Sequence, residues 1–284
     1  MADDVVVLGA GIMGADIAQV CAAAGHRVVL VDASTAALDA ARVRIDAALA
    51  RRVRRDDLTP DGARDLMARI DTNDRIQGAV TNADVVIEAV TEDVGVKRGV
   101  WRELGAHAHP EAVLASNTSS LSVTEIASFG GRPETTCGMH FFNPAAVLPL
   151  VEVVRGERTS DATLERARSF VVGLGKTPIV CADTPGFIVN RLLIPYVNDA
   201  IAAYAEGVAT AEDLDAAMTL GANVRIGPLA LADLIGLDVT LAAIEALQRE
   251  TGDPRYRPAP LLRRMVRAGK LGRKSGEGFF HYDV

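Results

Sequence analysis

The chain opens with short apolar runs that are separated by longer amphipathic stretches. Valine, isoleucine, leucine and alanine dominate four of these runs, at residues 5–8, 27–31, 83–90 and 112–116. Continuous runs of this length are typical of strands that are buried on both faces of a parallel sheet. The stretches between them, at residues 15–24, 36–55, 91–106 and 121–128, are long enough to form helices. The alternation therefore predicts an α/β domain built from β–α–β units.

The pattern changes after the turn-forming stretch Ala182–Gly186. Beyond it, helical patterns follow one another at residues 187–206, 211–219, 229–251 and 260–268, with no convincing strand before the last residues. Thr210, three residues before Asp213, has the spacing of a helix N-cap. Apolar residues on several faces of the first and third of these helices indicate a self-association surface. We therefore predict one domain over residues 1–184 and an all-helical domain over residues 185–284.

A glycine-rich turn, Gly9-Ala10-Gly11-Ile12-Met13-Gly14, follows the first apolar run and precedes the first predicted helix. Gly9 permits the tight turn, Gly11 lets a pyrophosphate approach the backbone, and Gly14 allows close helix–strand packing. Asp32 ends the second predicted strand, where a carboxylate accepts hydrogen bonds from an adenosine ribose and repels a 2′-phosphate. This context favours a Rossmann-type, doubly wound domain that binds NAD over a strand–helix turn without a ligand.

His140 and Glu152 are candidates for acid–base chemistry. His140 lies between two apolar segments, Thr135–Met139 and Leu148–Val154, which read as strands joined by a turn at Asn143-Pro144. Adjacent strands can bring the two side chains together, and a carboxylate beside an imidazole fixes the ring tautomer and stabilises the imidazolium. The alternative is a hydrogen-bonded core histidine with a charge at the sheet edge.

Composition narrows the class of protein. The chain has 284 residues, 49% hydrophobic and 24% charged, as expected for a globular protein of one or two domains. The net charge of −7 gives no support to nucleic-acid binding. The three cysteines show no metal or disulfide spacing, no secretory signal precedes the first strand, and no apolar run is long enough to span a membrane. We expect a cytoplasmic protein without a metal site.

Two further features each admit two interpretations. Arginines 51, 52, 54 and 55 gather near the end of the predicted helix at residues 36–55, either as a solvated face or as a site for a phosphorylated ligand. Ser119, which follows the strand at residues 112–116, could serve as a hydrolase nucleophile. No Gly-x-Ser-x-Gly elbow surrounds it, however, and a hydrolase would leave the glycine-rich turn unexplained.

Taken together, these motifs resemble the L-3-hydroxyacyl-CoA dehydrogenase family in its short, monofunctional form. The resemblance covers essentially the whole chain and rests on several motifs in the same order: Gly9–Gly14, Ser116–Ser120, His140–Pro144, Asp183–Arg191 and Lys270–Phe279. It implies that His140 is the catalytic acid–base and Glu152 its partner, and that Ser119 and Asn190 hold the C3 oxygen of the substrate. The positions that it places around NAD are Gly9, Gly11, Ile12, Met13, Gly14, Asp32, Glu92, Lys97, Asn117 and Asn143.

The same resemblance implies an activity. We expect reversible NAD-dependent oxidation of a (3S)-3-hydroxyacyl-CoA to the 3-ketoacyl-CoA, with 3-hydroxybutyryl-CoA as the first expected substrate and fatty acid metabolism as the setting. The arginine-bearing helical hairpin resembles the arm that meets coenzyme A. The C-terminal domain resembles the family's substrate and dimerisation domain, so a homodimer is expected.

One departure keeps the substrate open. Relatives commonly carry His-Pro after a Gly-Ala-Asn such as Gly221–Asn223, whereas this chain has Val224-Arg225. An arginine there would suit an acyl chain with a terminal carboxylate, as in 3-hydroxyadipyl-CoA. The sequence also allows an acyl-carrier-protein thioester or a free hydroxy acid as the substrate, and a non-catalytic NAD-binding sensor as the function.

Overall fold

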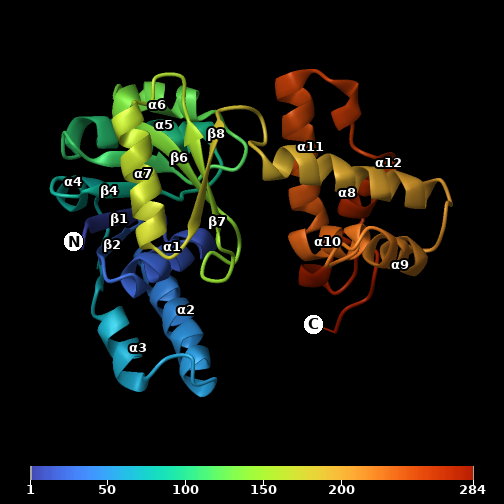
Figure 1. Ribbon diagram of the computed structural model, residues 1–284, viewed down its shortest axis with the longest axis horizontal. Coiled ribbons are helices and arrows are strands. Elements are labelled where there is room, and N and C mark those ends of the chain that lie inside the picture. Colours follow the sequence, from blue (N-terminus) through green and yellow to red (C-terminus); the bar gives the residue numbers. More distant parts are fainter. Residues whose placement is uncertain (1, 284) are drawn as a thin grey trace. The chain divides into compact units, whose positions relative to one another are not determined.

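The computed structural model describes residues 2–283. The chain divides into two compact units, Met1–Thr184 and Pro185–Val284. The first contains a sheet with helices on both faces, and the second is helical (Figure 1). The predicted fold class, a Rossmann-type α/β domain followed by an all-helical domain, is confirmed.

Eight strands form one sheet in the first unit. In chain order they are β1 (Asp4–Leu8), β2 (Arg27–Val31), β3 (Ile70–Asn73), β4 (Val85–Glu88), β5 (Val113–Ser116), β6 (Thr136–Phe141), β7 (Leu150–Arg155) and β8 (Thr177–Ala182). Their order across the sheet is β3-β2-β1-β4-β5-β6-β7-β8. The first six strands are parallel, which gives the strand order of a dinucleotide-binding sheet. β7 runs antiparallel to β6, and β8 is parallel to β7.

Seven helices accompany this sheet: α1 (Ile12–Ala23), α2 (Thr35–Arg54), α3 (Pro60–Met67), α4 (Ile76–Val80), α5 (Val94–His107), α6 (Val123–Gly130) and α7 (Asp161–Gly173). Helices α1, α2 and α7 pack on one face, and α4, α5 and α6 pack on the other (Figure 1). Alternate residues of β1 serve the two layers, since Val5 and Val7 pack with the first set and Val6 and Leu8 with the second. The near-continuous apolar runs of the sequence therefore reflect burial on both faces.

Sequence patterns did not predict β3 or α4. β3 has the sequence Ile-Asp-Thr-Asn and only Ile70 is buried, so it lacks the apolar run that identified the other strands. It lies at the sheet edge and is defined by its pairing with β2. α4 has only five residues, which is too short for a periodic pattern to emerge.

The second unit contains α8 (Val189–Ala205), α9 (Ala211–Gly221), α10 (Pro228–Ile235), α11 (Leu237–Thr251) and α12 (Pro260–Arg267). The prediction of a single helix over residues 229–251 was wrong. Gly236 separates α10 from α11, because its φ of 101° is incompatible with a right-handed helix. The predicted N-cap is confirmed, since the Thr210 side chain accepts a hydrogen bond from the Asp213 N–H. Pro195 lies inside α8.

Residues 2–283 contain neither a membrane-spanning helix nor a metal-binding cluster. No helix in this range is long and apolar enough to cross a membrane. No group of three or more His, Cys, Asp or Glu side chains in the same range is arranged to hold a metal ion.

Candidate active site

The glycine-rich turn has two positions where only glycine fits. Gly9 has a φ of 100°, and a Cβ there would lie 2.5 Å from the backbone oxygen of Ala89. A Cβ on Gly14, in the first turn of α1, would lie 1.7 Å from the backbone oxygen of Gly9. The two glycines therefore let the turn fold back against β4 and against the start of its own helix.

Gly11 differs from both, because no atom lies within 4 Å of the position that its Cβ would take. It forms the N-cap of α1, and no side chain caps the helix there. Open space beside the unpaired N–H groups of a helix N-terminus fits an approaching pyrophosphate. The residues of the turn therefore fit a bound NAD. Gly9 and Gly14 allow the chain to fold tightly, and Gly11 leaves space for the pyrophosphate.

Asp32 follows β2 and links the turn to the next strand. Its Oδ2 accepts a hydrogen bond from the Ala10 N–H at 2.8 Å, and its Oδ1 accepts one from the Ser34 N–H at 2.9 Å. Both contacts hold the carboxylate at the carboxyl end of β2, next to the glycine turn. This is the position in which an acid meets the adenosine ribose of a bound NAD.

His140 and Glu152 lie directly opposite each other in the β6–β7 pair. The distance from His140 Nδ1 to Glu152 Oε2 is 2.7 Å, and both side chains are almost fully buried. Because the ionised carboxylate accepts a hydrogen bond from Nδ1–H, the neutral ring carries its lone pair at Nε2. Nε2 is then the atom able to take up or donate a proton.

Asn117 connects this pair to the neighbouring strand. It follows β5, and its Oδ1 accepts a hydrogen bond from the Phe141 N–H at 2.8 Å. Phe142, two residues after His140, places its ring 4.4 Å from the imidazole, centroid to centroid. The hydrogen bond between Asn117 and Phe141 therefore holds the end of β5 to the end of β6 next to His140.

Ser119 lies in the turn after β5, and Glu92 organises that turn. Glu92 Oε1 accepts hydrogen bonds from the N–H groups of Ser119, at 3.0 Å, and Ser120, at 3.2 Å. Lys97 Nζ lies 3.2 Å from Glu92 Oε2. Burial raises the pKa of the Glu92 carboxyl, but the Lys97 charge and hydrogen bonds from Thr118 and Ser119 lower this pKa by more, so it lies below its ordinary value.

Glu88 also belongs to this group, although no sequence motif singled it out. It ends β4, is fully buried, and its Oε1 lies 2.6 Å from Lys97 Nζ. The signal was present in the sequence, because an acid directly after Val85-Val86-Ile87 ends a strand that is otherwise apolar.

Of the expected site residues, the first unit contains all except Asn190. Ser119, Asn117, His140 and the glycine turn follow or end parallel strands, so they share the carboxyl edge of the sheet, where open α/β sheets bind ligands. Asn143 is exposed in the segment between β6 and β7. Asn190 lies in the first turn of α8, in the second unit.

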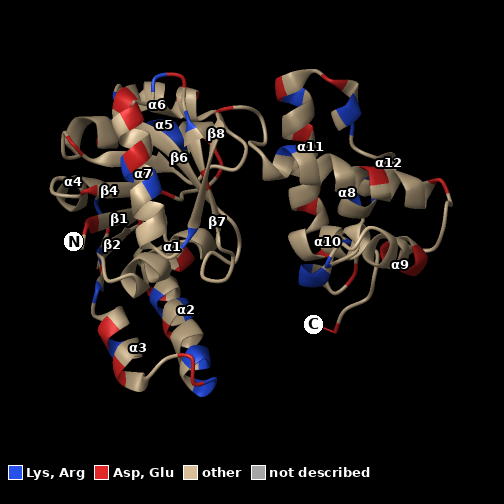
Figure 2. Ribbon diagram, in the orientation of Figure 1, with Lys and Arg blue, Asp and Glu red and all other residues tan. Residues whose placement is uncertain are grey.

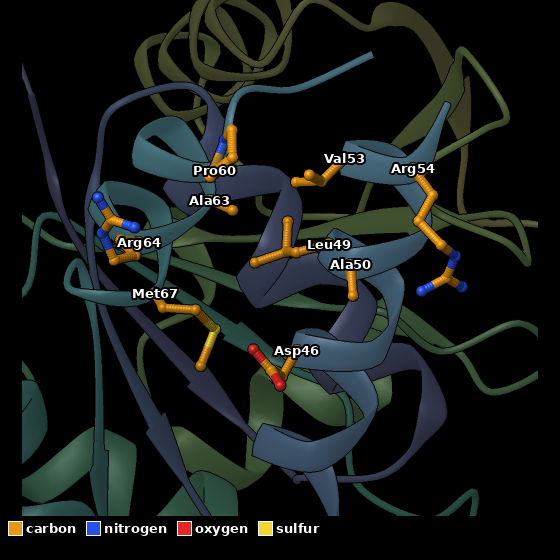
Figure 3. Close-up of a pocket in the computed structure, with 9 residues that line it drawn as sticks. All are labelled: Asp46, Leu49, Ala50, Val53, Arg54, Pro60, Ala63, Arg64 and Met67. Carbon is orange, nitrogen blue, oxygen red and sulfur yellow. The ribbon is translucent and has the colours of Figure 1, made fainter. Parts of the chain in front are cut away.

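The helical hairpin formed by α2 and α3 carries the arginine cluster. Figure 2 shows Lys and Arg residues clustered at the end of α2. They are Arg51, Arg52 and Arg54, followed by Arg55. A cavity of about 600 Å³ lies between the two helices (Figure 3). Its lining is mostly apolar, with Leu49, Val53 and Met67, and the charged side chains at it are Asp46, Arg54 and Arg64.

A glycine-rich nucleotide turn and a buried histidine–carboxylate pair at the same carboxyl edge of one sheet define a class of protein, the dinucleotide-dependent oxidoreductases. Family models make the class specific. The model described as "3-hydroxyacyl-CoA dehydrogenase, NAD binding domain" matches residues 4–184, and that of the "C-terminal domain" matches residues 186–282. The chain belongs to the 3-hydroxyacyl-CoA dehydrogenase family, a family of NAD-dependent oxidoreductases. The resemblance found in the sequence and the expected cofactor are confirmed.

Individual members of the family are similar to this chain over nearly its full length. The chain is 46% identical to a probable 3-hydroxybutyryl-CoA dehydrogenase of Deinococcus radiodurans, over 97% of this chain and 99% of that protein. It is 42% identical to a 3-hydroxybutyryl-CoA dehydrogenase of Clostridioides difficile, over 98% of each chain. The crystal structure of an (S)-3-hydroxybutyryl-CoA dehydrogenase from Ralstonia eutropha superposes with a TM-score of 0.95 at 43% identity and covers 100% of both chains.

Proposed function

We propose that the protein catalyses the reversible oxidation of short (3S)-3-hydroxyacyl-CoA thioesters, with 3-hydroxybutyryl-CoA as the principal substrate. The observation that carries the proposal is the 2.7 Å contact between His140 Nδ1 and Glu152 Oε2 at the carboxyl end of the sheet. The names of the full-length relatives, 3-hydroxybutyryl-CoA dehydrogenases, support the choice of acyl group.

His140 is the acid–base group in this proposal. Its Nε2 removes the proton from the 3-hydroxyl group of the substrate, and in the reverse direction the protonated ring donates to the 3-keto oxygen. Glu152 holds Nδ1–H and stabilises the imidazolium that forms. NAD, when bound, supplies the hydride acceptor.

Other side chains position the reactants. Ser119 and Asn190 hold the C3 oxygen. The turn from Gly9 to Gly14, including Ile12 and Met13, receives the pyrophosphate, and Asp32 receives the adenosine ribose. Asn117, Asn143, Glu92 and Lys97 complete the surroundings of the cofactor. The unit at residues 1–184 thus serves the nucleotide, and the unit at residues 185–284 serves the acyl substrate and dimerisation.

The hairpin of α2 and α3 is the proposed contact for coenzyme A. Guanidinium groups pair with phosphate oxygens in a two-point geometry, which the arginines at the end of α2 can provide. Neutralising Arg51, Arg52 and Arg55 together should raise the KM for acyl-CoA and leave the KM for NADH unchanged.

The proposed assembly is a homodimer formed through the C-terminal helices. Apolar side chains that are exposed in the second unit support it, namely Leu192, Val208, Leu220, Leu234 and Val239. Light scattering after size exclusion tests this directly, and a mass near that of one 29.9 kDa chain would contradict it.

The function is tested by NADH oxidation with a panel of 3-keto compounds. The panel contains acetoacetyl-CoA, longer 3-ketoacyl-CoAs, a carboxylated 3-ketoacyl-CoA, an acyl-carrier-protein thioester and the free acids. The proposal requires the highest kcat/KM with acetoacetyl-CoA. Activity with free acids alone would contradict the proposal and indicate a dehydrogenase of free hydroxy acids. NADH binding without turnover of any substrate would indicate a non-catalytic sensor.

A second substrate, a carboxylated acyl-CoA, is favoured by Arg225. This residue is exposed in the segment between α9 and α10, two residues after Asn223, whose φ is 56°. A carboxylate at the far end of an acyl chain could form paired hydrogen bonds with its guanidinium.

A further inference from the structure

A fully buried ion pair lies beneath the Ser119 turn. The Glu88 side chain has no exposed surface, and Lys97 is 1% exposed. Lys97 Nζ and the Val90 N–H, at 2.6 Å and 3.0 Å, donate to Glu88 Oε1. Trp101 Nε1 and Ser116 Oγ, at 3.2 Å and 2.7 Å, donate to Oε2. Four donors saturate the carboxylate, so it is fixed to β4, β5 and α5 at once.

A contribution to the stability of the fold does not by itself explain why Glu88 and Lys97 are buried as an ion pair. Removing two charges from water is costly, and a buried ion pair often stabilises a protein no more than apolar side chains of the same volume would. Geometry offers a better account, because a saturated buried carboxylate holds its partner in one place.

Lys97 connects the fixed Glu88 carboxylate to Glu92. Its Nζ lies 2.6 Å from Glu88 Oε1 and 3.2 Å from Glu92 Oε2, so one ammonium group bridges two carboxylates. Glu88 is buried, whereas about a third of the Glu92 side chain, 36%, is exposed. The bridge therefore connects the rigid interior to the surface at the carboxyl edge of the sheet.

Glu92 in turn binds the turn that carries Ser119. Its Oε1 accepts hydrogen bonds from the N–H groups of Ser119 and Ser120 and from the Ser120 hydroxyl, at 3.0, 3.2 and 3.1 Å. The Thr118 hydroxyl donates to the same oxygen. Residues 117–121 form no helix or strand, so this one oxygen supplies much of what fixes their conformation.

We propose that Glu88 is a positioning residue for Ser119, acting through Lys97 and Glu92. The relay Glu88–Lys97–Glu92 sets the backbone of the Ser119 turn and hence the place of the Ser119 hydroxyl. This inference rests on the proposed function, which gives Ser119 its contact with the substrate oxygen. It also gives Lys97 a positioning role in addition to its place around the cofactor, since its charged end lies between two carboxylates.

The variant Glu88→Gln tests the relay without changing side-chain size. An amide has one oxygen in place of two, so its NH2 group must face either Lys97 or the donors Trp101 and Ser116. The relay then loses its fixed end. A displacement of about 1 Å at a reacting group can cost on the order of 10²-fold in rate, so kcat should fall by about this factor while the dissociation constant for NADH stays nearly unchanged.

Trp101 reports on the same site. It is the only tryptophan of the chain, and its indole N–H donates to Glu88. Emission of the folded Glu88→Gln variant should shift relative to the parent, and energy transfer from Trp101 to NADH measures cofactor binding independently of turnover.

A double-mutant cycle separates positioning from general damage. In the Ser119→Ala background, Glu88→Gln should lower kcat little further, because the group that it positions is already gone. If the two losses multiply, the relay does not act through Ser119 and the inference fails. It also fails if Glu88→Gln weakens NADH binding strongly while kcat is retained. Should Glu88→Gln not fold, Glu92→Gln, at the exposed end of the relay, takes its place in the same cycle. Multiplied losses in kcat alone then decide against the inference, because Glu92 also belongs to the proposed surroundings of the cofactor.

Asp233→Asn is the matched control. Asp233 is a buried carboxylate in the second unit, where it accepts hydrogen bonds from the N–H groups of Phe279 and Phe280 and from the Tyr282 hydroxyl. This variant should lower the melting temperature without coupling to Ser119→Ala. Coupling equal to that of Glu88→Gln would mean that the cycle measures stability only. Failure of the proposed function is distinguishable, because Ser119→Ala alone would then leave kcat unchanged.

Discussion

The side-chain oxygen of Asn117 accepts a hydrogen bond from the backbone N–H of Phe141 at 2.8 Å. Asn117 lies two residues before Ser119, and Phe141 directly follows His140. The hydrogen bond therefore ties the segment of the proposed substrate-binding serine to the strand of the proposed acid–base histidine. Motion of one segment relative to the other would break this partly buried hydrogen bond, so the two should move together.

The histidine–glutamate pair should behave as one unit in catalysis. His140→Asn and Glu152→Gln should each lower kcat by about 10²–10⁴-fold, the usual contribution of general acid–base catalysis. NADH binding, measured by fluorescence, should remain nearly intact. The double variant should be far less impaired than the product of the single effects. Multiplicative losses would show that the two side chains perform separate tasks.

Gly11 and Gly14 should respond differently to the same substitution. Gly14→Ala places a Cβ 1.7 Å from the Gly9 backbone oxygen, so it should lower the melting temperature strongly or prevent folding. Gly11→Ala meets no atom within 4 Å, so thermal stability should be retained. NADH binding should still weaken, because the added methyl group occupies the approach of the pyrophosphate. Unchanged NADH affinity in Gly11→Ala would place the pyrophosphate elsewhere.

Asp32 should determine the choice of cofactor. A like-charge contact with a 2′-phosphate costs several kcal/mol, so kcat/KM should favour NADH over NADPH by about 10²-fold or more. Asp32→Ser should reduce this preference, mainly by improving NADPH. Asp71→Ser, which removes an exposed acid from β3, is the control and should leave the ratio unchanged. An equal preference in the parent enzyme would refute the role given to Asp32.

Thr118→Val should make stability less dependent on acid pH. The pKa of Glu92 is lowered in the folded protein, so its ionised form stabilises the fold above the unfolded pKa, and this contribution is lost as the pH falls through the folded pKa. Removing the Thr118 hydroxyl raises the folded pKa. The variant should lose only about 1 kcal/mol at neutral pH, because solvent at the partly exposed Glu92 weakens the contact, and the loss should shrink at low pH.

Thr240→Val provides the comparison for this pH dependence. Its buried hydroxyl donates to the Gly236 carbonyl at 3.0 Å, and no carboxylate takes part. Chemical denaturation at several pH values should therefore give a constant loss for Thr240→Val. A constant loss for Thr118→Val as well would contradict the assignment of the lowered Glu92 pKa to this hydrogen bond.

Arg225 should matter only if the acyl chain carries a terminal carboxylate. A hydrogen bond between charged groups contributes about 1.5–3 kcal/mol, which is about tenfold or more in kcat/KM. The measurement compares 3-hydroxybutyryl-CoA with 3-hydroxyadipyl-CoA in the parent enzyme and in Arg225→Ala. If the ratio of the two kcat/KM values is the same in both proteins, Arg225 does not recognise the acyl terminus.

Sequence patterns identified the elements whose burial is regular. The apolar runs predicted the central strands, and the glycine turn was recognisable because three separate constraints converge on six residues. β3 was not recognisable, since one buried isoleucine gives no period and only pairing with β2 defines the strand. The break between α10 and α11 was missed for a different reason. Gly236 is compatible with either conformation until the packing of the second unit selects a positive φ.

In the candidate site, too, some contacts could be predicted from local sequence patterns and others could not. The contact of His140 with Glu152 followed from two apolar segments and a turn, because their pairing needed only local information. The roles of Glu88 and Lys97 could not be predicted in this way. They depend on side chains from β4, β5 and α5 meeting at one carboxylate, and a linear pattern does not specify such a meeting.

Because β7 runs antiparallel to β6, the pairing of His140 with Glu152 depends on the register of the two strands and not on the segment that joins them. Four residue pairs, from Gly138↔Val154 to Phe141↔Val151, hold the register. A shift by one residue would turn Glu152 to the opposite face of the sheet. Exchange or lengthening of residues 144–149 would leave both the register and Asn143 in place. The same acid–base pair can therefore be combined with different connecting segments, which leaves this part of the surface open to redesign.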